Sequence, residues 1–539
     1  MSKLSSFKFS LIEWIIGFTG ILFIRFFLES LSIKNSSGFL PSDVLTLVHY
    51  YLFYLGLLLS LVLLARKFLP YTTAQLLAVS LWVLPIIWLA PLVDLLFGGI
   101  GNMPMAYIFQ GGLGLVKSFV TFLGPWQLPG ITLGIRLEVL LILIFVGYLV
   151  QTTHHNWRKT LGALIAGYAI FWGWLAFPSL VKFLADLVYG KIITAQPNEI
   201  AFFFNQLTSN SILAKNLFNP AIGFSSEPVR YEQFFNAVMS QLFIFLDVSL
   251  LIALFWRGLK EKILAVFRNS RPERVAYYFS WIIFGEVLAY KQNLHFRMHW
   301  NLFDLTSIAL LFFSYYCAWM FSVGVNDIRD YRIDAVSNPD RPLVSQSLSF
   351  AEMKYFNLLW LGWALISALV VGQYQFFFVL TFIFAYHLYS SAPLRLKRPF
   401  IISTFLIALA TLSVTLAGFF LFRVDKEMAA LPYGLIIFIL IAITLIANVK
   451  DLKDMLGDRQ EGIKTLPVIY GEAKAKKIIG IFFIVAYLLE PLFLGKLGLL
   501  LPALAVGIIS YLVIQREDFK ERWVFYLFFF YQLIALLII

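Results

Sequence analysis

Charged residues are scarce in this sequence. Only 13% of the 539 residues are Asp, Glu, Lys or Arg, whereas 60% are hydrophobic and the mean hydropathy is +0.82. Soluble domains carry about 25% charged residues on average. The composition therefore excludes a soluble globular protein, and the solvent for most of this chain is expected to be lipid.

Cysteine is almost absent. Cys317 is the only one, and it lies within an apolar run. A single cysteine excludes a disulfide within the chain and excludes a cysteine-rich zinc site. We interpret Cys317 as a small packing residue.

Acidic residues are fewer than basic ones, 30 against 42, and the resulting net charge of +12 could indicate nucleic-acid binding. The basic residues, however, gather in short loops between apolar runs, at Arg66-Lys67, at Arg158-Lys159 and between Arg257 and Arg274. This distribution is typical of the cytoplasmic loops of membrane proteins. We therefore expect no nucleic-acid partner and a multi-pass protein of the cell or cytoplasmic membrane, with these loops on the cytoplasmic side.

Apolar runs recur along the whole chain, and about 20 such residues cross a hydrocarbon core as a helix. In the first half we predict spans near Phe9–Leu31, Leu45–Ala65, Thr73–Phe97, Leu133–Val150, Leu161–Val188 and Phe234–Phe255. In the second half we predict spans near Val275–Tyr290, Leu302–Gly324, Met353–Val371, Phe376–Tyr389, Ile401–Phe422, Leu431–Val449, Lys477–Leu494, Leu499–Ile514 and Trp523–Ile539. The predicted fold class is an all-α polytopic membrane protein.

A domain boundary is expected in the basic stretch between Arg257 and Arg274, which separates two strongly apolar regions. The predicted domains are residues 1–269, a bundle of about six spans, and residues 270–539. No cluster in the first domain indicates chemistry. We expect that domain to be a membrane-embedded module for oligomer or partner contacts, or one that organises lipid substrates.

Two acidic motifs in the second half share the spacing D-x2-D-x3-D, and each follows a predicted span. Positions i, i+3 and i+7 lie on one face of a helix, so each motif is expected to present a stripe of three carboxylates. The first motif, which Asn326 precedes, is Asp327, Asp330 and Asp334; the second is Asp451, Asp454 and Asp458.

Six converging carboxylates would repel one another unless cations lay between them. Carboxylate oxygens suit Mg²⁺, which commonly binds a few carboxylates together with substrate phosphates. We therefore predict a diphosphate bridged by Mg²⁺. The alternative, two solvated helix ends, would explain either motif alone but not the same spacing twice on one side of the membrane.

Basic residues complement the acidic motifs. Arg395, Lys397 and Arg398 follow Tyr389 in a loop predicted on the same side of the membrane, and Arg341 and Arg459 lie just beyond the motifs. Anchoring of a cytoplasmic loop could account for the first three. We favour a role in stabilising the charge that builds on a diphosphate as its carbon–oxygen bond breaks.

Together, these residues resemble the UbiA superfamily of intramembrane prenyltransferases over about Pro272–Ile539. The resemblance rests on four features: Asn326-Asp327-x2-Asp330-x3-Asp334, Asn338-Pro339-Asp340-Arg341-Pro342-Leu343, the loop from Tyr389 to Lys397, and Asp451-x2-Asp454-x2-Gly457-Asp458-Arg459 with Gly462 and Thr465-Leu466-Pro467-Val468. Gln346 and Ala392 depart from the residues common in that family. The resemblance implies a nine-helix bundle and a Mg²⁺-dependent transferase of alkyl groups.

The resemblance also implies roles for individual residues. Asn326, Asp330, Asp334, Asp454 and Asp458 would hold Mg²⁺ and diphosphate, with Asp327 and Asp451 supporting them. Lys397, with Arg395 or Arg398, would grip the diphosphate, Tyr389 would line the cavity, and Arg341 and Arg459 would contact substrate.

The implied reaction moves an isoprenyl chain from an allylic polyprenyl diphosphate to a lipophilic acceptor. The second motif looks closer to family members that use glycerol phosphate lipids, tetrapyrrole esters or homogentisate-like rings, so both lipid and aromatic acceptors stay open. A different class of function is a transporter of cations or lipid phosphates that uses the same carboxylates. The expected position of the carboxylates at helix mouths, opposite a basic loop, disfavours transport.

Overall fold

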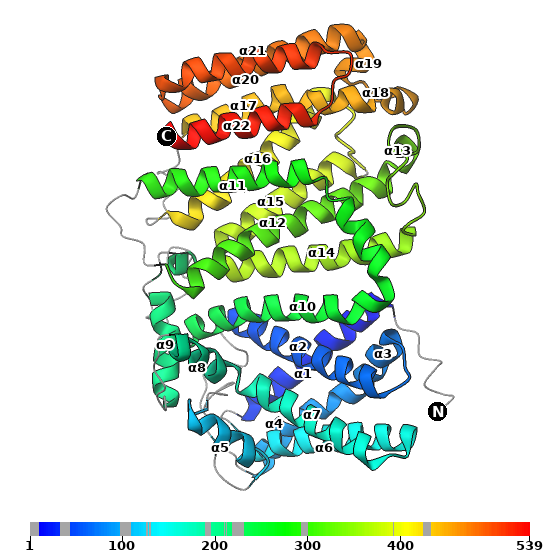
Figure 1. The fold of residues 1–539 in the computed structure, drawn as a ribbon, viewed down its shortest axis with the longest axis vertical. Coiled ribbons are helices and arrows are strands. Elements are labelled where there is room, and N and C mark those ends of the chain that lie inside the picture. The colour runs from blue at the N-terminus through cyan, green and yellow to red at the C-terminus, as the bar shows by residue number, and fades with distance from the viewer. Residues whose placement is uncertain are drawn as a thin grey trace. The chain divides into compact units, whose positions relative to one another are not determined.

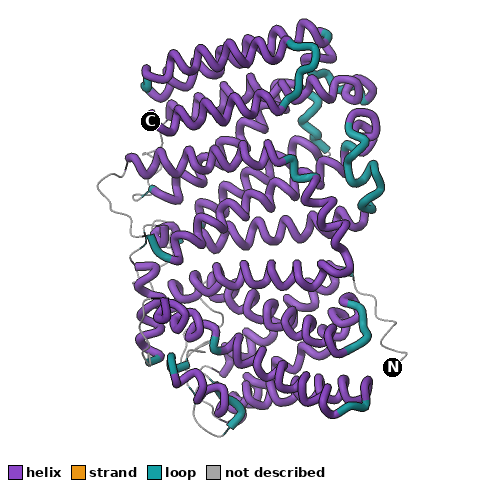
Figure 2. Tube along the Cα trace, in the orientation of Figure 1, coloured by secondary structure: helices purple, strands orange, loops and turns teal. Residues whose placement is uncertain are grey.

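The computed structural model describes residues 10–32, 44–97, 109–124, 128, 131–188, 196–209, 211, 213–217, 231–292, 300–391, 393–423 and 433–538. Within these residues every regular element is a helix, and only two isolated β-bridges occur (Figure 2). The all-helical fold class predicted from composition is confirmed. The chain divides into two compact units, and it passes from unit 1 to unit 2 after Leu259.

Unit 1 contains the helices of the first half of the chain (Figure 1). They are α1 (Leu11–Ser32), α2 (Val44–Phe68), α3 (Thr73–Val83), η2 (Leu84–Trp88), α4 (Leu89–Phe97), α5 (Leu113–Thr121), α6 (Leu133–His154), α7 (Trp157–Leu175), α8 (Phe177–Val188), α9 (Pro197–Ser209) and α10 (Tyr231–Arg268) as far as its kink at Leu259.

The predicted span Leu161–Val188 is not one helix. It forms α7 and α8, which meet at Ala176 at an angle of 75°. Pro178 in the first turn of α8 lacks a backbone N–H and disfavours helical geometry in the residue before it, so the helix cannot continue straight. The first half therefore contains a broken span.

Ion pairs lie within the bundle of unit 1. Arg25 on α1 contacts Glu138 on α6 at 2.8 Å and Glu29 one turn along at 3.0 Å. Arg25 and Glu138 are buried. Charged side chains inside a membrane bundle avoid lipid and pair with one another, as these do.

Unit 2 contains the remaining helices, from Lys260 onward, together with a short segment around η3. They are η3 (Leu213–Asn216), α11 (Pro272–Gln292), α12 (Leu302–Arg329), α13 (Tyr331–Ser337), α14 (Phe350–Val371), α15 (Gln373–Ser390), α16 (Phe400–Phe422), α17 (Tyr433–Ile446), η6 (Ala447–Lys450), α18 (Asp451–Gln460), α19 (Leu466–Tyr470), α20 (Glu472–Leu494), η7 (Leu497–Leu499), α21 (Leu500–Gln515) and α22 (Arg522–Ile538).

The helices of unit 2 pack closely where glycine faces a neighbour. A Cβ atom at Gly285 on α11 would lie 2.1 Å from the carbonyl oxygen of Thr415 on α16, and one at Gly418 on α16 would lie 2.3 Å from that of Ile282. Small residues let helix backbones approach in this way within a bilayer. The tight α11–α16 contact places the start of α11 beside the polar end of the bundle.

All nine helices predicted for the second half occur at the expected positions among the described residues. By length and apolarity, eleven described helices could cross a membrane, or twelve if the bent pair counts as one span. Of the fifteen predicted spans, α11, α15 and α22 fall outside this measure, and α22 has only 17 residues. Shorter or more polar helices can still belong to the bundle because their neighbours shield them from lipid.

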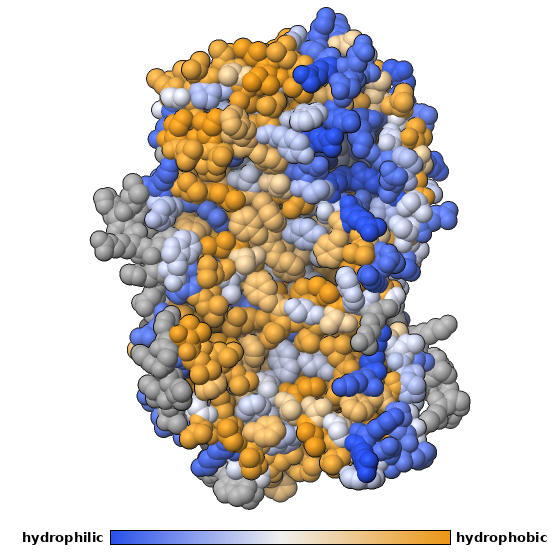
Figure 3. Space-filling model, viewed as in Figure 1, coloured by the Kyte–Doolittle hydropathy of each residue, from blue (hydrophilic) through white to orange (hydrophobic). Residues whose placement is uncertain are grey.

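Hydrophobic side chains cover most of the face shown in Figure 3. Hydrophilic side chains of unit 2 gather along one edge of that face, over the region where α13 and α18 lie, and surround a hollow (Figures 1 and 3). The apolar area is the surface that a bilayer would cover. The hollow lies at the polar ends of the helices.

Candidate active site

A cavity of about 660 Å³ opens among the polar helix ends of unit 2. Residues from the end of α12, from α13, from the α15–α16 loop and from η6 and α18 line it. The starts of α11, α20 and α22, the loop after α18 and the loop before α22 also contribute to the wall. Segments that are far apart in the sequence therefore meet around one space.

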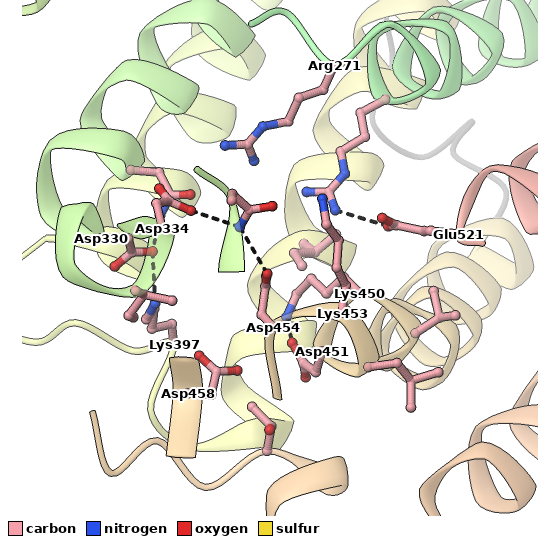
Figure 4. A pocket seen from close by; sticks show the side chains of 18 of the residues that line it. Arg271, Asp330, Asp334, Lys397, Lys450, Asp451, Lys453, Asp454, Asp458 and Glu521 are labelled. Carbon is pink, nitrogen blue, oxygen red and sulfur yellow. Dashed lines mark hydrogen bonds and ion pairs between the residues drawn. The ribbon is translucent and has the colours of Figure 1, made fainter. Parts of the chain in front are cut away.

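Both acidic motifs contribute to this cavity (Figure 4). Asp451, Asp454 and Asp458 all lie on α18, as the spacing predicts. The first motif is different, because α12 ends at Arg329 and α13 begins at Tyr331. Asp327, which lies on α12 before the break, is not in the cavity lining, whereas Asp330 and Asp334 line it.

Asn338 joins the two motifs directly. Its Nδ2 atom donates hydrogen bonds to Asp334 Oδ1 at 3.0 Å and to Asp454 Oδ1 at 3.3 Å. Gly457 makes this approach possible, because a Cβ atom there would lie 2.8 Å from both Ile333 and Ser337 on α13. The two aspartate motifs thus face each other across the width of one amide group.

Asp330 lies against the basic loop. Lys397 Nζ contacts its Oδ2 atom at 2.8 Å, Arg395 Nη2 contacts its Oδ1 atom at 3.1 Å, and Asn326 donates a hydrogen bond to it. The loop is turned inward by a left-handed backbone at Arg395, with φ of 41°. Backbone hydrogen bonds from Leu396 to Leu388 and from Lys397 to Tyr389 hold that turn against α15.

Tyr389 lines the cavity beside Lys450. The Lys450 ammonium group lies 5.5 Å from the centre of the Tyr389 ring and pairs with Asp451. Lys450 thereby offsets the carboxylate of the second motif that lies nearest to the end of α17.

The three other carboxylates of the two motifs that line the cavity, those of Asp334, Asp454 and Asp458, have less positive charge close to them. Asp334 lies 4.0 Å from Arg341, and within the described part of the chain Asp454 accepts a side-chain hydrogen bond only from the neutral amide of Asn338. Asp458 is 5% exposed, and among the residues that the structure describes it forms no ion pair within 4 Å, although the charges of Lys397 and Lys450 act on it. Burial raises the pKa of Asp334 to about 6, although the nearby Arg341 opposes the shift. These three acids form the part of the site that attracts additional positive charge.

This donor set fits Mg²⁺ in one particular way. In the described residues no three acidic, histidine or cysteine side chains close around a single point as a complete metal cage. Mg²⁺ seldom uses such cages and usually binds through one or two carboxylates, water and substrate phosphates. The open, oxygen-only arrangement of Asp334, Asp454 and Asp458 fits that mode.

The structure brings most of the sequence-predicted site residues together, but not all. Asn326, Asp330, Asp334, Arg341, Tyr389, Lys397, Asp451, Asp454 and Asp458 line the cavity, and Arg395 reaches it through Asp330. Arg398 and Arg459 are exposed and lie outside the lining, as does the buried Asp327. Ala392 lies outside the described residues.

Several lining residues were not singled out in the sequence. Arg271 and Arg274 enter from the basic stretch that looked like a linker, and Arg274 pairs with Glu521 of the loop before α22 at 3.0 Å. Lys450 and Asn338 were also missed as site residues. Asn338 stands in the Asn338-Pro339-Asp340-Arg341 motif and Lys450 directly precedes Asp451, so both had a local signal. Arg271 and Arg274 had none, because their partners Asp327 and Glu521 are distant in the sequence.

The sequence matches the model of the UbiA prenyltransferase family over residues 280–534, which includes both acidic motifs. It is 30% identical over 227 residues to digeranylgeranylglyceryl phosphate synthase of Methanosarcina mazei, a match that covers 39% of this chain and 75% of that protein. The proteins of the same name from Methanocaldococcus jannaschii and Methanococcus aeolicus are 28% and 31% identical. Those matches cover 39% and 33% of this chain, and 69% and 61% of the relatives.

Two solved structures are also similar to this chain. A UbiA homolog from Archaeoglobus fulgidus bound to GPP and Mg²⁺ aligns at 17% identity with a TM-score of 0.39, covering 51% of this chain and 97% of that one. The same homolog bound to DMAPP and Mg²⁺ aligns at 16% identity with a TM-score of 0.40, covering 50% and 96%.

Proposed function

Because this chain belongs to the UbiA prenyltransferase family, we propose that unit 2 transfers a prenyl group from a prenyl diphosphate to a lipophilic acceptor. The observation that carries this proposal is the meeting of two aspartate motifs around one cavity, with Asn338 spanning Asp334 and Asp454. Like-charged motifs that converge in this way repel one another, and Mg²⁺ with an anionic ligand would offset that repulsion.

Asp334, Asp454 and Asp458 are the principal residues that would hold Mg²⁺, with Asn326, Asp330 and Asp451 around them. When bound, the metal ion supplies positive charge that offsets the charge developing on the departing diphosphate. Asp330 is already paired with Lys397 and Arg395, so its share in metal binding is smaller. Asp327 is not among the residues proposed to hold Mg²⁺, because it lies outside the cavity lining.

The chain's own cations act on the diphosphate. Lys397 is buried at the cavity wall, and Arg395 shares its partner Asp330. Held in place before substrate binds, both groups would stabilise the oxygen anions that form as the carbon–oxygen bond breaks. Arg398 and Arg459, which are exposed, would act only on the charge of the surrounding surface.

Apolar and aromatic side chains protect the reacting carbon from water. Trp319, Val323, Ile407, Phe525 and Tyr386 line the same cavity. Water would capture an allylic cation, so a wall of this kind favours attack by the acceptor instead. The faces of the aromatic rings can also stabilise positive charge.

The names of the relatives include both a lipid acceptor and an aromatic acceptor, and both kinds of acceptor are lipophilic. The archaeal relatives bear the name of a synthase of a phosphate-bearing lipid, whereas naringenin 8-dimethylallyltransferase 2 of Sophora flavescens, 31% identical over 185 residues, is named for an aromatic acceptor. That match covers 32% of this chain and 44% of the relative. We propose that the acceptor enters from the membrane, on the cytoplasmic side that the basic loops predict.

The transporter alternative finds no support in the relatives described above, which are named as a synthase and a dimethylallyltransferase. For unit 1 we propose a role apart from catalysis, in oligomer or partner contacts or in organising lipid substrates. The buried ion pair of Arg25 and Glu138 in unit 1 can be understood as a structural contact between two helices, and it does not indicate a catalytic site. Residues 270–539 are proposed as the catalytic domain.

The test uses purified full-length protein with a labelled allylic diphosphate, Mg²⁺ and an extract of membrane lipids. We expect release of pyrophosphate and a labelled lipid product that mass spectrometry identifies. Chelation of divalent metal and the Asp454→Asn variant should each abolish both signals. An intact donor after incubation with folded wild-type protein would contradict prenyl transfer, and its movement across a vesicle membrane would instead indicate transport.

A further inference from the structure

The short turn between α10 and α11 is built into the site. This entry turn, Asn269-Ser270-Arg271, precedes Pro272 and lies just before the residues that the family model matches. Arg271 has φ of 55°, in the left-handed region that a side chain of this size seldom adopts. Strained backbone of this kind persists where surrounding contacts hold it, and it is common at functional sites.

Asp327 supplies those contacts. Its Oδ2 atom accepts a hydrogen bond from Asn269 Nδ2 at 2.6 Å, and its Oδ1 atom accepts one from Arg271 Nη2 at 2.8 Å. Arg341 Nη1 lies 3.4 Å from the same Oδ1 atom and 3.3 Å from Asn269 Oδ1. The side chain of Asp327 is 1% exposed, so both of its oxygens face the entry turn and Arg341 instead of the cavity.

The backbone of the entry turn is held from the same helix. Trp319 Nε1, two turns before Asp327 on α12, donates a hydrogen bond to the carbonyl oxygen of Ser270 at 2.7 Å. The turn is therefore fixed at two points along α12. One contact fixes its backbone and the other its two polar side chains.

The consequence of this anchoring lies in the cavity. Arg271 and Arg341 both line it, and the buried Nε atom of Arg271 has no hydrogen-bond partner among the described residues. Figure 4 shows Arg271 and Lys397 on different sides of the acidic residues. The carboxylate of Asp327 thus holds two guanidinium groups at the cavity wall opposite the basic loop. Its single negative charge neutralises only half of their combined positive charge.

We propose that Asp327 is a positioning residue and not a metal ligand: it holds Arg271 and Arg341 so that their guanidinium groups bind a phosphoryl group of a substrate. This inference rests on the proposed prenyl transfer for the identity of the substrate. The geometry suits phosphate, which arginine binds through two parallel N–H donors. Both the diphosphate of the donor and a phosphate on the acceptor have this chemistry.

The test compares Asp327→Asn, Arg271→Gln, Arg271→Lys and the double variant Asp327→Asn/Arg271→Gln in the full-length protein. Arg268→Gln is the matched control, because Arg268 is an exposed arginine at the end of α10 next to the turn. Binding of inorganic pyrophosphate with Mg²⁺ and of glycerol phosphate is measured by calorimetry. Binding of Mn²⁺ alone is measured by electron paramagnetic resonance, and donor KM and kcat by pyrophosphate release.

We expect Asp327→Asn and Arg271→Gln each to weaken binding of a phosphate probe by about tenfold or more, as loss of a charge-assisted hydrogen bond predicts. The double variant should bind no more weakly than the poorer single variant, because both changes remove the same interaction. Arg271→Lys should recover part of the loss, and Arg268→Gln should bind as the wild type does. Mn²⁺ binding should stay within about twofold of wild type in Asp327→Asn, since no metal ligand is lost.

The two phosphate probes identify the source of the phosphoryl group. Selective loss of pyrophosphate binding, with a raised donor KM and a nearly unchanged kcat, assigns the site to the donor; selective loss of glycerol phosphate binding assigns it to the acceptor. Weakened Mn²⁺ binding in Asp327→Asn, or Arg271→Gln binding both probes as Arg268→Gln does, would overturn the proposal.

These binding measurements do not depend on catalysis. Failure of prenyl transfer in the wild type would therefore refute the proposed function while leaving the phosphate site to be decided. If Asp327→Asn does not fold in a thermal unfolding assay, the comparison of Arg271→Gln, Arg271→Lys and Arg268→Gln still supports or overturns the site.

Discussion

Gly457 controls the distance between the two aspartate motifs, and Gly457→Ala tests whether that distance matters. The added Cβ would lie 2.8 Å from Ile333 Cγ2 and from Ser337 Oγ, and 3.2 Å from the carbonyl oxygen of Ile333. Carbon atoms in contact normally lie about 3.5–4.0 Å apart. The backbone contact falls short of that distance by about 0.3 Å and the two side-chain contacts by about 0.7 Å, so we expect α18 to move away from α13 by roughly 0.3–0.7 Å.

A shift of this size acts directly on the acids. Asn338 spans Asp334 and Asp454 with hydrogen bonds of 3.0 and 3.3 Å, and a separation greater by about 0.3–0.7 Å would stretch the longer one beyond hydrogen-bond range. Misplacement of reacting groups by about 1 Å can lower a catalytic rate by about 100-fold. We therefore expect Gly457→Ala to lower kcat by about 10- to 100-fold, even though alanine favours the helix more than glycine.

The assay is pyrophosphate release from an allylic diphosphate across a range of Mg²⁺ concentrations. Gly362→Ala on α14 is the matched control, since a Cβ atom there meets nothing within 4 Å and should leave turnover unchanged. Replacing Ile333 by alanine in the Gly457→Ala protein should restore part of the lost rate by removing one close contact. Turnover of folded Gly457→Ala equal to that of Gly362→Ala would refute the reasoning.

Three further predictions concern the acids and the bundle of unit 1. Asp454→Asn and Asp458→Asn should each lower kcat by about 100-fold or more, measured by pyrophosphate release, because a charge that holds the metal ion is lost; near-normal turnover would argue against that residue's role. Burial raises the pKa of Asp334 to about 6 and that of Asp458 to about 7, so both carboxyl groups take up protons as pH falls from 7.5 to 5.5, and the Mg²⁺ concentration for half-maximal activity should rise. The rise should be smaller in Asp334→Asn, in which residue 334 no longer titrates, and an equal rise would contradict the role of Asp334. Arg25→Met leaves Glu138 unpaired and should lower the free energy of unfolding by about 3–5 kcal/mol in denaturant titration. The double variant Arg25→Met/Glu138→Leu should recover most of the lost stability. Equal stability of the single and double variants would show that an uncompensated charge on Glu138 is not the cause.

The helices could be predicted where the signal is local. A run of about twenty apolar residues indicates a span wherever it occurs, and the nine helices of the second half follow from such runs. The failure at Leu161–Val188 has a local cause too, since Pro178 bends the chain there. That proline was visible in the sequence, but helices in membranes often tolerate proline, so its effect depends on the surrounding helices.

The acidic motifs were found from spacing alone, and helical periodicity describes the second one correctly. In the first motif the helix breaks at Asp330, and this break separates Asp327 from Asp334. Nothing in the spacing reveals a helix end inside it. The pairing of Asp327 with Asn269 and Arg271 lies beyond sequence reasoning for the same reason, because it joins residues more than fifty positions apart.

The sequence by itself determined three properties: that this chain is a membrane protein, which residues form its helices, and which acids form two motifs of the same spacing. These properties depend on composition and on neighbours along the chain. Only the tertiary structure decided which of those acids face one cavity, which basic groups neutralise them and which charges stay uncompensated. Electrostatic interactions act through space over a few ångströms. The chemistry of each aspartate is therefore set by the helix that packs against it, and the order of residues does not state which helix that is.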